Sequence, residues 1–328
     1  MPPSHARPVG DGSGRSSRQD DNIIEAAWLY FHDGLNQGDV AKRLNISRAS
    51  VVNYLAEARR RDYVRITLDS DVFSTNQLAA DLKQKYAINE ALIVPADTSS
   101  ATRSFERVIR AASDWLPQFL NAGDHLGIAW GETIYRLAEV APKLDLPDIT
   151  IVQLIGSRPS EIGFAAENCA ATLAQRFGAH CANLHVPLLL STPELCESLK
   201  AEPMIARQLQ MIADCNKVIF AAGTVDENSH IALTGLLDED SLMKMRARGA
   251  AGVICGRIID RTGAAMPAPN EDRMIGVSLD QMHKKELGML VSAGLDRVSA
   301  ARAAMTGGYV THLVTCSASA QELLQDEK

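Results

Sequence analysis

Residues 34–61 carry side chains that could bind nucleic acid. The segment reads GLNQGDVAKRLNISRASVVNYLAEARRR. Short or planar polar residues such as Ser47, Arg48, Ser50 and Asn53 can reach base edges or phosphates from the outer face of a helix. Residues 42–65 hold seven Lys or Arg against two acidic residues, whereas the whole chain has a formal charge of −7. Positive charge concentrated in one segment of an acidic chain predicts a contact with DNA.

Two short helices are needed to present these residues. Apolar residues recur at helical spacing first in residues 40–44 and again in residues 51–55. Asn45 and Ile46 form the turn between them, and Ser47 is suited to cap the second helix. This is a helix–turn–helix pattern, whose second helix reads bases. The predicted DNA-contact residues are Gln37, Ser47, Arg48, Ser50, Asn53, Arg59 and Arg60.

The alternative for this segment is a solvated helical hairpin whose basic face binds no partner. The agreement of apolar spacing, cap and charge favours DNA binding. An apolar stripe in residues 20–34 predicts a supporting first helix, and the alternation YVRITL at residues 63–68 predicts a wing strand. Residues 1–20 are rich in Pro, Gly, Ser and Arg, so we expect a disordered tail. The DNA-binding domain is therefore predicted to span residues 21–68, with a linker over residues 69–75.

Length and composition define the rest of the chain. At 328 residues, of which 46% are hydrophobic and 22% charged, the protein has room for a second, larger globular domain over residues 76–328. We find neither a secretory signal nor an apolar run long enough to span a membrane. The six cysteines are scattered without a C-x-x-C pair, which argues against a disulfide framework or a zinc site. We expect a cytoplasmic protein without metal or cofactor.

The second domain alternates short apolar runs with amphipathic helices. The runs that we predict as strands begin at residues 91, 125, 149, 183, 217, 252, 288 and 309. Near-continuous apolar strands separated by helices are typical of a mostly parallel sheet covered on both faces. The fold class is therefore α/β, with an N-terminal winged helix–turn–helix and a Rossmann-like second domain. Ligands of such sheets bind beyond the carboxyl ends of the strands.

The loop after HLGIAW is the most informative of these strand ends. Gly131 permits a tight turn, and Glu132 and Thr133 open a helix whose first amide groups, with the Thr133 hydroxyl, could bind an anion. Such a turn is also common at junctions that bind nothing, where the Thr only caps the helix. This motif alone does not decide between an anion site and a simple helix cap.

Further loops add candidate ligand contacts. The segment AAGTVDENSHI would place Gly223, Thr224, Asp226 and His230 on a pocket rim. Arg297 follows a later strand, and its planar guanidinium can donate hydrogen bonds to two oxygens of one phosphate. Asp260, after GRII, could accept hydrogen bonds from sugar hydroxyls.

Taken together, these motifs resemble the SorC/DeoR group of bacterial sugar-responsive transcription regulators. The resemblance covers residues 22–324 and is carried by the helix–turn–helix, LGIAWGET, IVQLIGS, GTVDENSHI, GAAGVICGRIIDRTG and the closing SAGLDRVSAARAAMTGGYVTHLVT. It implies an effector domain related in fold to phosphosugar isomerases, a sugar, polyol or sugar phosphate as effector, operator DNA as partner, and a homodimer or homotetramer. By position, Gly131 and Thr133 would hold a phosphate. Glu132 stands where the family often has Arg, and Arg297 where it commonly has Lys.

Two other functions compete with a regulator of a carbohydrate operon, for which repression is the commoner mode in the family. The first is a phosphosugar isomerase carrying a DNA-binding module, with Asp226, Glu227 and His230 as the cluster that could supply a base. The second is an architectural DNA-binding protein without an effector. The first would show turnover of a phosphosugar, and the second would leave the large domain unexplained.

Overall fold

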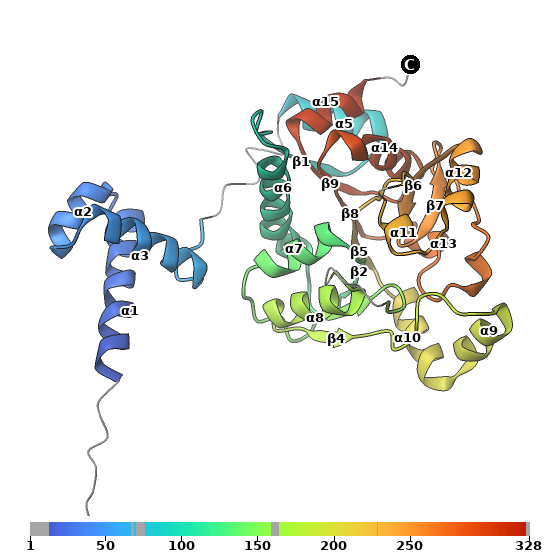
Figure 1. Ribbon diagram of the computed structural model, residues 1–328, viewed down its shortest axis with the longest axis horizontal. Helices are drawn as coiled ribbons and strands as arrows, with labels where there is room; N and C mark the ends of the chain where they lie inside the picture. Colours follow the sequence, from blue (N-terminus) through green and yellow to red (C-terminus); the bar gives the residue numbers. More distant parts are fainter. Residues whose placement is uncertain (1–12, 67–68, 70–75, 159–163, 228, 326–328) are drawn as a thin grey trace, which may run out of the picture. The chain divides into compact units, whose positions relative to one another are not determined.

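A computed structural model describes residues 13–66, 69, 76–158, 164–227 and 229–325. The chain divides into two compact units, Met1–Leu68 and Asp69–Lys328. Figure 1 shows both units, and each is described below by itself. The expected linker falls on residues 69–75, of which only Asp69 is described. Residues 1–12 of the expected disordered tail also lie outside the described residues.

The N-terminal unit contains only helices among its described residues. They are α1 (Ser13–Ala27), a π-helical turn (Trp28–His32), α2 (Gln37–Leu44) and α3 (Arg48–Arg60). The Asn36 side chain caps α2, and the Ser47 hydroxyl caps α3 by accepting a hydrogen bond from the Ser50 amide. Asn45 closes α2 in the left-handed conformation with φ of 52°. The predicted two helices, turn and Ser47 cap are confirmed.

Two expectations for this unit differ from what the described residues show. Helix α1 begins at Ser13, so residues 13–20 are helical and not disordered. Once the buried turn around Ile23 has formed, each added helical residue costs little, and Asp20 pairs with Arg61 at 2.5 Å. The expected wing is absent from residues 63–66, which form no strand. A strand needs a neighbour to bond to, and no described residue of this unit forms one; residues 67–68 lie outside the description.

The second unit is built on a seven-stranded sheet in which every pairing is parallel. In spatial order its strands are β1 (Glu90–Val94), β9 (His312–Cys316), β8 (Leu287–Val291), β5 (Lys217–Phe220), β2 (His125–Ile128), β3 (Thr150–Gln153) and β4 (His180–Ala182). All of these strands except β4 are buried along nearly their whole length. The predicted parallel α/β sheet is confirmed.

Helices surround this sheet (Figure 1). In chain order they are α5 (Gln77–Tyr86), α6 (Ala101–Trp115), α7 (Glu132–Val140), α8 (Ala166–Phe177), α9 (Pro193–Ala201), α10 (Pro203–Ala213), α11 (His230–Leu233), α12 (Glu239–Ala247), α13 (Leu279–Met282), α14 (Val298–Thr306) and α15 (Ser317–Leu324). Short 3-10 turns lie at Leu116–Phe119, Glu271–Arg273 and Leu295–Arg297.

Two predicted strands differ from the structure. The run NLHVPLLL, beginning at residue 183, is irregular apart from isolated bridges, and the strand is β4, just before it. Pro187 cannot donate to a ladder, although Leu184 and Leu188 are buried. The run GVICGRII is two strands, β6 (Ala250–Ile254) and β7 (Arg257–Asp260), in an antiparallel hairpin. Cys255 and Gly256, with φ of 50° and 79°, make the tight turn between them.

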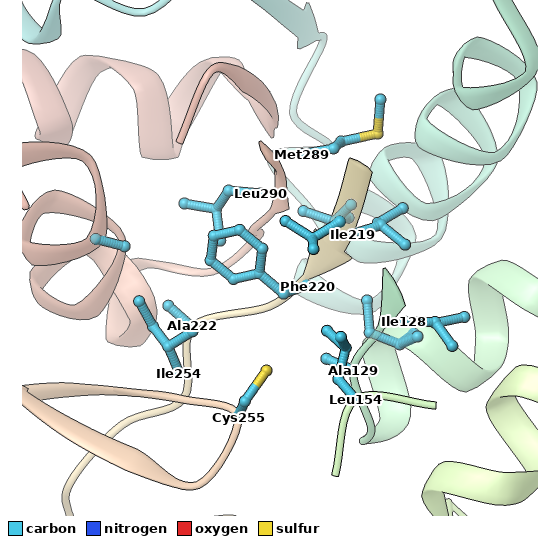
Figure 2. Close-up of a cluster of buried hydrophobic side chains, with 14 of the residues drawn as sticks. Ile128, Ala129, Leu154, Ile219, Phe220, Ala222, Ile254, Cys255, Met289 and Leu290 are labelled. Carbon is cyan, nitrogen blue, oxygen red and sulfur yellow. The ribbon is translucent and has the colours of Figure 1, made fainter. Parts of the chain in front are cut away.

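The order of the strands predicts a ligand-binding crevice at the carboxyl edge. From β2 the chain moves outward to β3, whereas from β5 it moves in the opposite direction to β8. The carboxyl ends of β2 and β5 therefore meet at a topological switch point, where ligands of open α/β sheets bind. Beneath this edge lies a hydrophobic core, which Figure 2 shows with side chains of β2, β5, β8 and the β6–β7 hairpin.

Candidate effector and DNA-binding sites

The junction between β2 and α7 presents amide groups at the crevice. Gly131 has φ of 101°, a conformation that residues with a side chain rarely adopt, and no side chain caps α7. The first amides of α7 therefore have no capping side chain, and they carry the positive end of the helix dipole. Thr133, in the first turn, is only 4% exposed. This geometry suits an anion.

Arg297 reaches the same place from the loop after β8. Gly294, with φ of 109°, turns the chain into the 3-10 segment that carries Arg297. Its Nη1 donates to the Thr133 hydroxyl at 3.4 Å, across 164 residues of sequence. Its Nε lies 3.8 Å from Asp296, whose side chain is 69% exposed and so compensates the charge weakly. The structure thus brings together two residues that were predicted as anion contacts on different loops.

His230, from the loop after β5, lies in the same cluster. Burial lowers the pKa of this imidazole below its usual value, and the charges of Arg158 and Arg297 lower that pKa further. The imidazole meets the Trp130 indole edge to face, with 4.4 Å between ring centroids. Loops following three different strands therefore converge here.

Arg158 and Trp130 were not predicted from the sequence. Arg158 follows β3, and burial lowers the pKa of its guanidinium. Its Nη2 would lie 3.6 Å from a Cβ placed on Gly235, which locates it beside the His230 loop. Among the described residues no carboxylate forms an ion pair with Arg158. A half-buried guanidinium that pairs with no described carboxylate and lies beside a second guanidinium indicates an anion site. Its one sequence signal is the polar GSR that ends an apolar run.

Two buried oxygens nearby lack partners among the described residues. They are the Ser229 Oγ, on a residue 3% exposed, and the Glu167 Oε2 in the first turn of α8. Ser229 directly precedes His230, and α8 follows the loop that begins at Arg158. Leaving such groups unpaired is costly, and a bound ligand with hydroxyl groups would satisfy them.

Thr224 and Asp226 lie in the expected loop after β5 and are half-buried. The Asp226 carbonyl accepts a hydrogen bond from the Ser229 amide at 3.0 Å. No described hydrogen bond joins either residue to Thr133 or Arg297. They are rim residues of the β5 loop.

Two predicted ligand contacts have other roles. Glu132 pairs with Arg136 at 2.8 Å on the exposed side of α7, which removes its carboxylate from the crevice. Gly223 exchanges both backbone hydrogen bonds with Val253, at 2.8 and 2.9 Å, and so ties the hairpin to the β5 loop. Neither group is placed to contact a ligand.

Asp260 lies away from the crevice. Its carboxylate accepts hydrogen bonds from Thr262 and from the Ala264 amide, and these bonds lower its pKa. The adjoining Gly263 carbonyl accepts from the Tyr309 hydroxyl at 2.8 Å, near the amino end of β9. Asp260 does not lie where a strand end was expected, because β7 is the return strand of a hairpin and does not end at the carboxyl edge of the sheet.

In the N-terminal unit, α3 presents the predicted reading face. Arg48 and Asn53 are exposed. The hydroxyls of Ser47 and Ser50 lie 2.9 Å apart and bond to each other. The Arg48 Nε donates to Gln37 Oε1 at 3.4 Å, and both residues line an open hollow with Tyr30 and residues 34–38.

The two cations at the end of α3 are not equivalent. Arg60 donates to Glu57 at 2.7 Å, and Glu57 also pairs with Arg61. These hydrogen bonds lower the pKa of Glu57 to about 2, so the carboxylate stays charged and compensates Arg60. Arg59 instead lies over the Phe31 ring, 5.2 Å from its centroid, and remains exposed. Arg59 is the better placed of the two to contact phosphate.

Comparison with known proteins agrees with this two-part organisation. The Sugar-bind family of sugar-binding domains matches residues 70–325, which is most of the chain. The chain belongs to the family of sugar-binding transcriptional regulators. It is 31% identical over 322 residues to an uncharacterized transcriptional regulator, YjhU, of Escherichia coli, covering 97% of this chain and 98% of that one. It is 27% identical to the deoxyribonucleoside regulator of Bacillus subtilis, covering 92% and 97% of the two chains.

Solved structures show the same fold. The full-length sorbitol operon regulator SorC from Klebsiella pneumoniae matches with a TM-score of 0.74 at 21% identity, over 96% of this chain and all of that one. A DeoR family transcriptional regulator from Listeria monocytogenes matches 75% of this chain with a TM-score of 0.70 at 22% identity. Among the described residues, no helix is long and apolar enough to cross a membrane.

Proposed function

We propose that this protein is a cytoplasmic repressor of a carbohydrate operon, and that an anionic sugar derivative bound at the carboxyl edge controls its operator binding. The observation that carries the proposal is the convergence of Thr133, His230, Arg158 and Arg297 at the switch point of the sheet. An exposed, cationic α3 supplies the DNA contact. Both halves of a ligand-controlled DNA-binding protein are therefore supported.

The ligand class follows from charge. Two guanidiniums and the amino end of α7 surround one crevice, and among the described residues only the exposed Asp296 forms an ion pair with either guanidinium. A neutral polyol would leave this charge uncompensated, whereas a phosphate would neutralise it and accept the Arg297 fork. The unpartnered Ser229 and Glu167 oxygens suit hydroxyl groups. We therefore favour a sugar phosphate as effector.

The relatives support a carbohydrate, since their names are sorbitol operon regulator, deoxyribonucleoside regulator and erythritol catabolism regulatory protein. The helix–turn–helix supports a homodimer or homotetramer, because paired recognition helices read two half-sites. We propose that Arg48, Asn53 and Arg59 contact DNA and that Ser47 and Ser50 mainly shape α3. Gln37 acts beside Arg48, and Arg60 contributes less because Glu57 compensates it.

Isomerase activity is the alternative, and we propose that the protein has none. Of the three residues that could supply a base, Asp226 and Glu227 lie on the rim of the β5 loop, Glu227 being exposed, and the ring of His230 meets that of Trp130 edge to face. Incubation with a panel of phosphosugars should give no product. Formation of an isomer at a rate proportional to protein concentration would require an enzyme.

The experiment that tests the proposal combines two readouts on one ligand panel. Sugars, polyols and their phosphates are first screened by thermal shift, because a ligand that binds the folded state raises the melting temperature. Those that bind are then added to the protein on its promoter DNA in a gel-shift titration. One sugar phosphate should raise the melting temperature and weaken the DNA complex. If every such ligand leaves the DNA complex unchanged, the control proposed here does not exist.

A further inference from the structure

We propose that Gln37 is a positioning residue that holds Arg48 in the orientation needed to read guanine. The proposal rests on the proposed DNA-binding function and adds to it a mechanism of base selection. The observation behind it is the hydrogen bond from Arg48 Nε to Gln37 Oε1, at 3.4 Å.

Both residues stand at the ends of capped helices. Gln37 is the first residue of α2, whose cap, Asn36, accepts hydrogen bonds from the amides of Gly38 and Asp39 at 2.9 and 3.1 Å. Arg48 is the first residue of α3, capped by Ser47 at 3.0 Å. The caps fix the backbone on either side of the turn, so the distance between the two side chains is set by the helix–turn–helix itself. Their hydrogen bond therefore restrains an otherwise exposed arginine.

The nitrogen of Arg48 that bonds to Gln37 determines which of its donors remain for DNA. A guanidinium has five N–H donors in a fixed fork, and Gln37 takes the one on Nε. The two terminal nitrogens remain, and this pair can donate together to O6 and N7 of guanine in the major groove. Without Gln37 the long side chain would sample many rotamers and would contact phosphates as readily as bases.

Comparison with the neighbouring residues favours Arg48 as the residue that reads guanine. The Ser47 hydroxyl is occupied by capping, and it also bonds to Ser50 at 2.9 Å. Arg48 also lines the hollow formed with Tyr30 and the start of α2, an open surface that DNA can approach. Of the residues in the first turn of α3, Arg48 has the donors that distinguish guanine from the other bases.

The test uses the full-length protein and a library of random duplex DNA. Selection with the wild-type protein defines the motif, and Arg48→Ala identifies which guanine that arginine reads. Affinity is then measured for the selected site and for the same site with that guanine replaced by adenine. For the wild type the ratio should be roughly 5- to 100-fold, as expected for one bidentate contact.

Three variants distinguish positioning from a general loss of affinity. Gln37→Ala should bring the ratio of the affinities for the guanine and adenine sites close to one, and it should leave the melting temperature unchanged. Gln37→Glu retains the acceptor, so it should preserve the ratio even though the added negative charge weakens all DNA binding. Arg43→Ala removes an exposed cation from α2 and should lower both affinities equally.

A ratio in Gln37→Ala within twofold of the wild type would overturn the proposal, as would loss of the ratio in Gln37→Glu. An Arg48→Ala protein with an unchanged motif would also overturn it. These outcomes all require a wild-type motif. If the wild-type protein enriches no sequence at all, the proposed DNA-binding function fails instead.

Discussion

Replacing Arg297 with alanine should weaken effector binding without disturbing the fold. The guanidinium donates to Thr133 from the loop after β8, and its side chain is 32% exposed, so its charge is only partly screened by water. A hydrogen bond to a charged group contributes roughly 1.5–3 kcal/mol. Because a third of this side chain is in solvent, we expect the lower part of that range, a loss of about 10- to 50-fold in affinity.

The assay is isothermal titration of the effector found in the thermal-shift screen. Arg136→Ala is the matched control, because Arg136 lies on α7, a few residues beyond Thr133, but pairs with Glu132 on the exposed side of the helix. It should change the affinity by less than about twofold, as expected for an exposed ion pair away from the site. If Arg297→Ala binds as tightly as Arg136→Ala, the crevice is not the effector site and the charge argument is wrong.

Three further changes test other parts of the molecule. Glu57→Gln should free the charge of Arg60, so the slope of log affinity for DNA against log salt should steepen by about one. Burial and two neighbouring guanidiniums lower the pKa of His230, so the unfolded chain binds a proton more readily than the folded chain. The melting temperature should therefore fall as the pH drops below the usual histidine pKa of about 6.5. His230→Asn should reduce that fall in a calorimetric pH series. Lys217 and Asp124 pair with side chains 5% and 8% exposed, and Lys217→Met should cost roughly 3–5 kcal/mol in denaturant unfolding because it leaves a buried carboxylate unpaired.

Local patterns in the sequence predicted much of the fold correctly. The Ser47 cap, the turn at Asn45 and the buried strand β8 each depend on residues within one short segment, which sequence reasoning can evaluate. The hairpin β6–β7 was missed for a physical reason. Its residues are buried on both strands, so the run resembles one central strand, and only the positive φ of Cys255 and Gly256 separates the two.

The candidate site was predictable only in part. Thr133 and Arg297 were found because each follows a recognisable strand and a glycine turn. Arg158 was missed because its one local signal, the polar GSR that ends an apolar run, is weak, and its importance comes from residues more than 70 positions away. Asp260 was assigned wrongly because its place depended on the strand before it, and that strand runs the other way.

The order of strands in the sheet also bears on how one ligand would control DNA binding. Strands β8, β5, β2 and β3 are neighbours, so their following loops bring Arg297, His230, Thr133 and Arg158 to one crevice from four separate parts of the chain. Without a ligand the two guanidiniums repel each other, and a bound anion would turn that repulsion into shared attraction. Part of the binding energy would then fix the arrangement of the loops. A ligand shifts a conformational equilibrium only through contacts that differ between the two conformations. A molecule held by one loop alone would therefore bind without changing the arrangement of the loops.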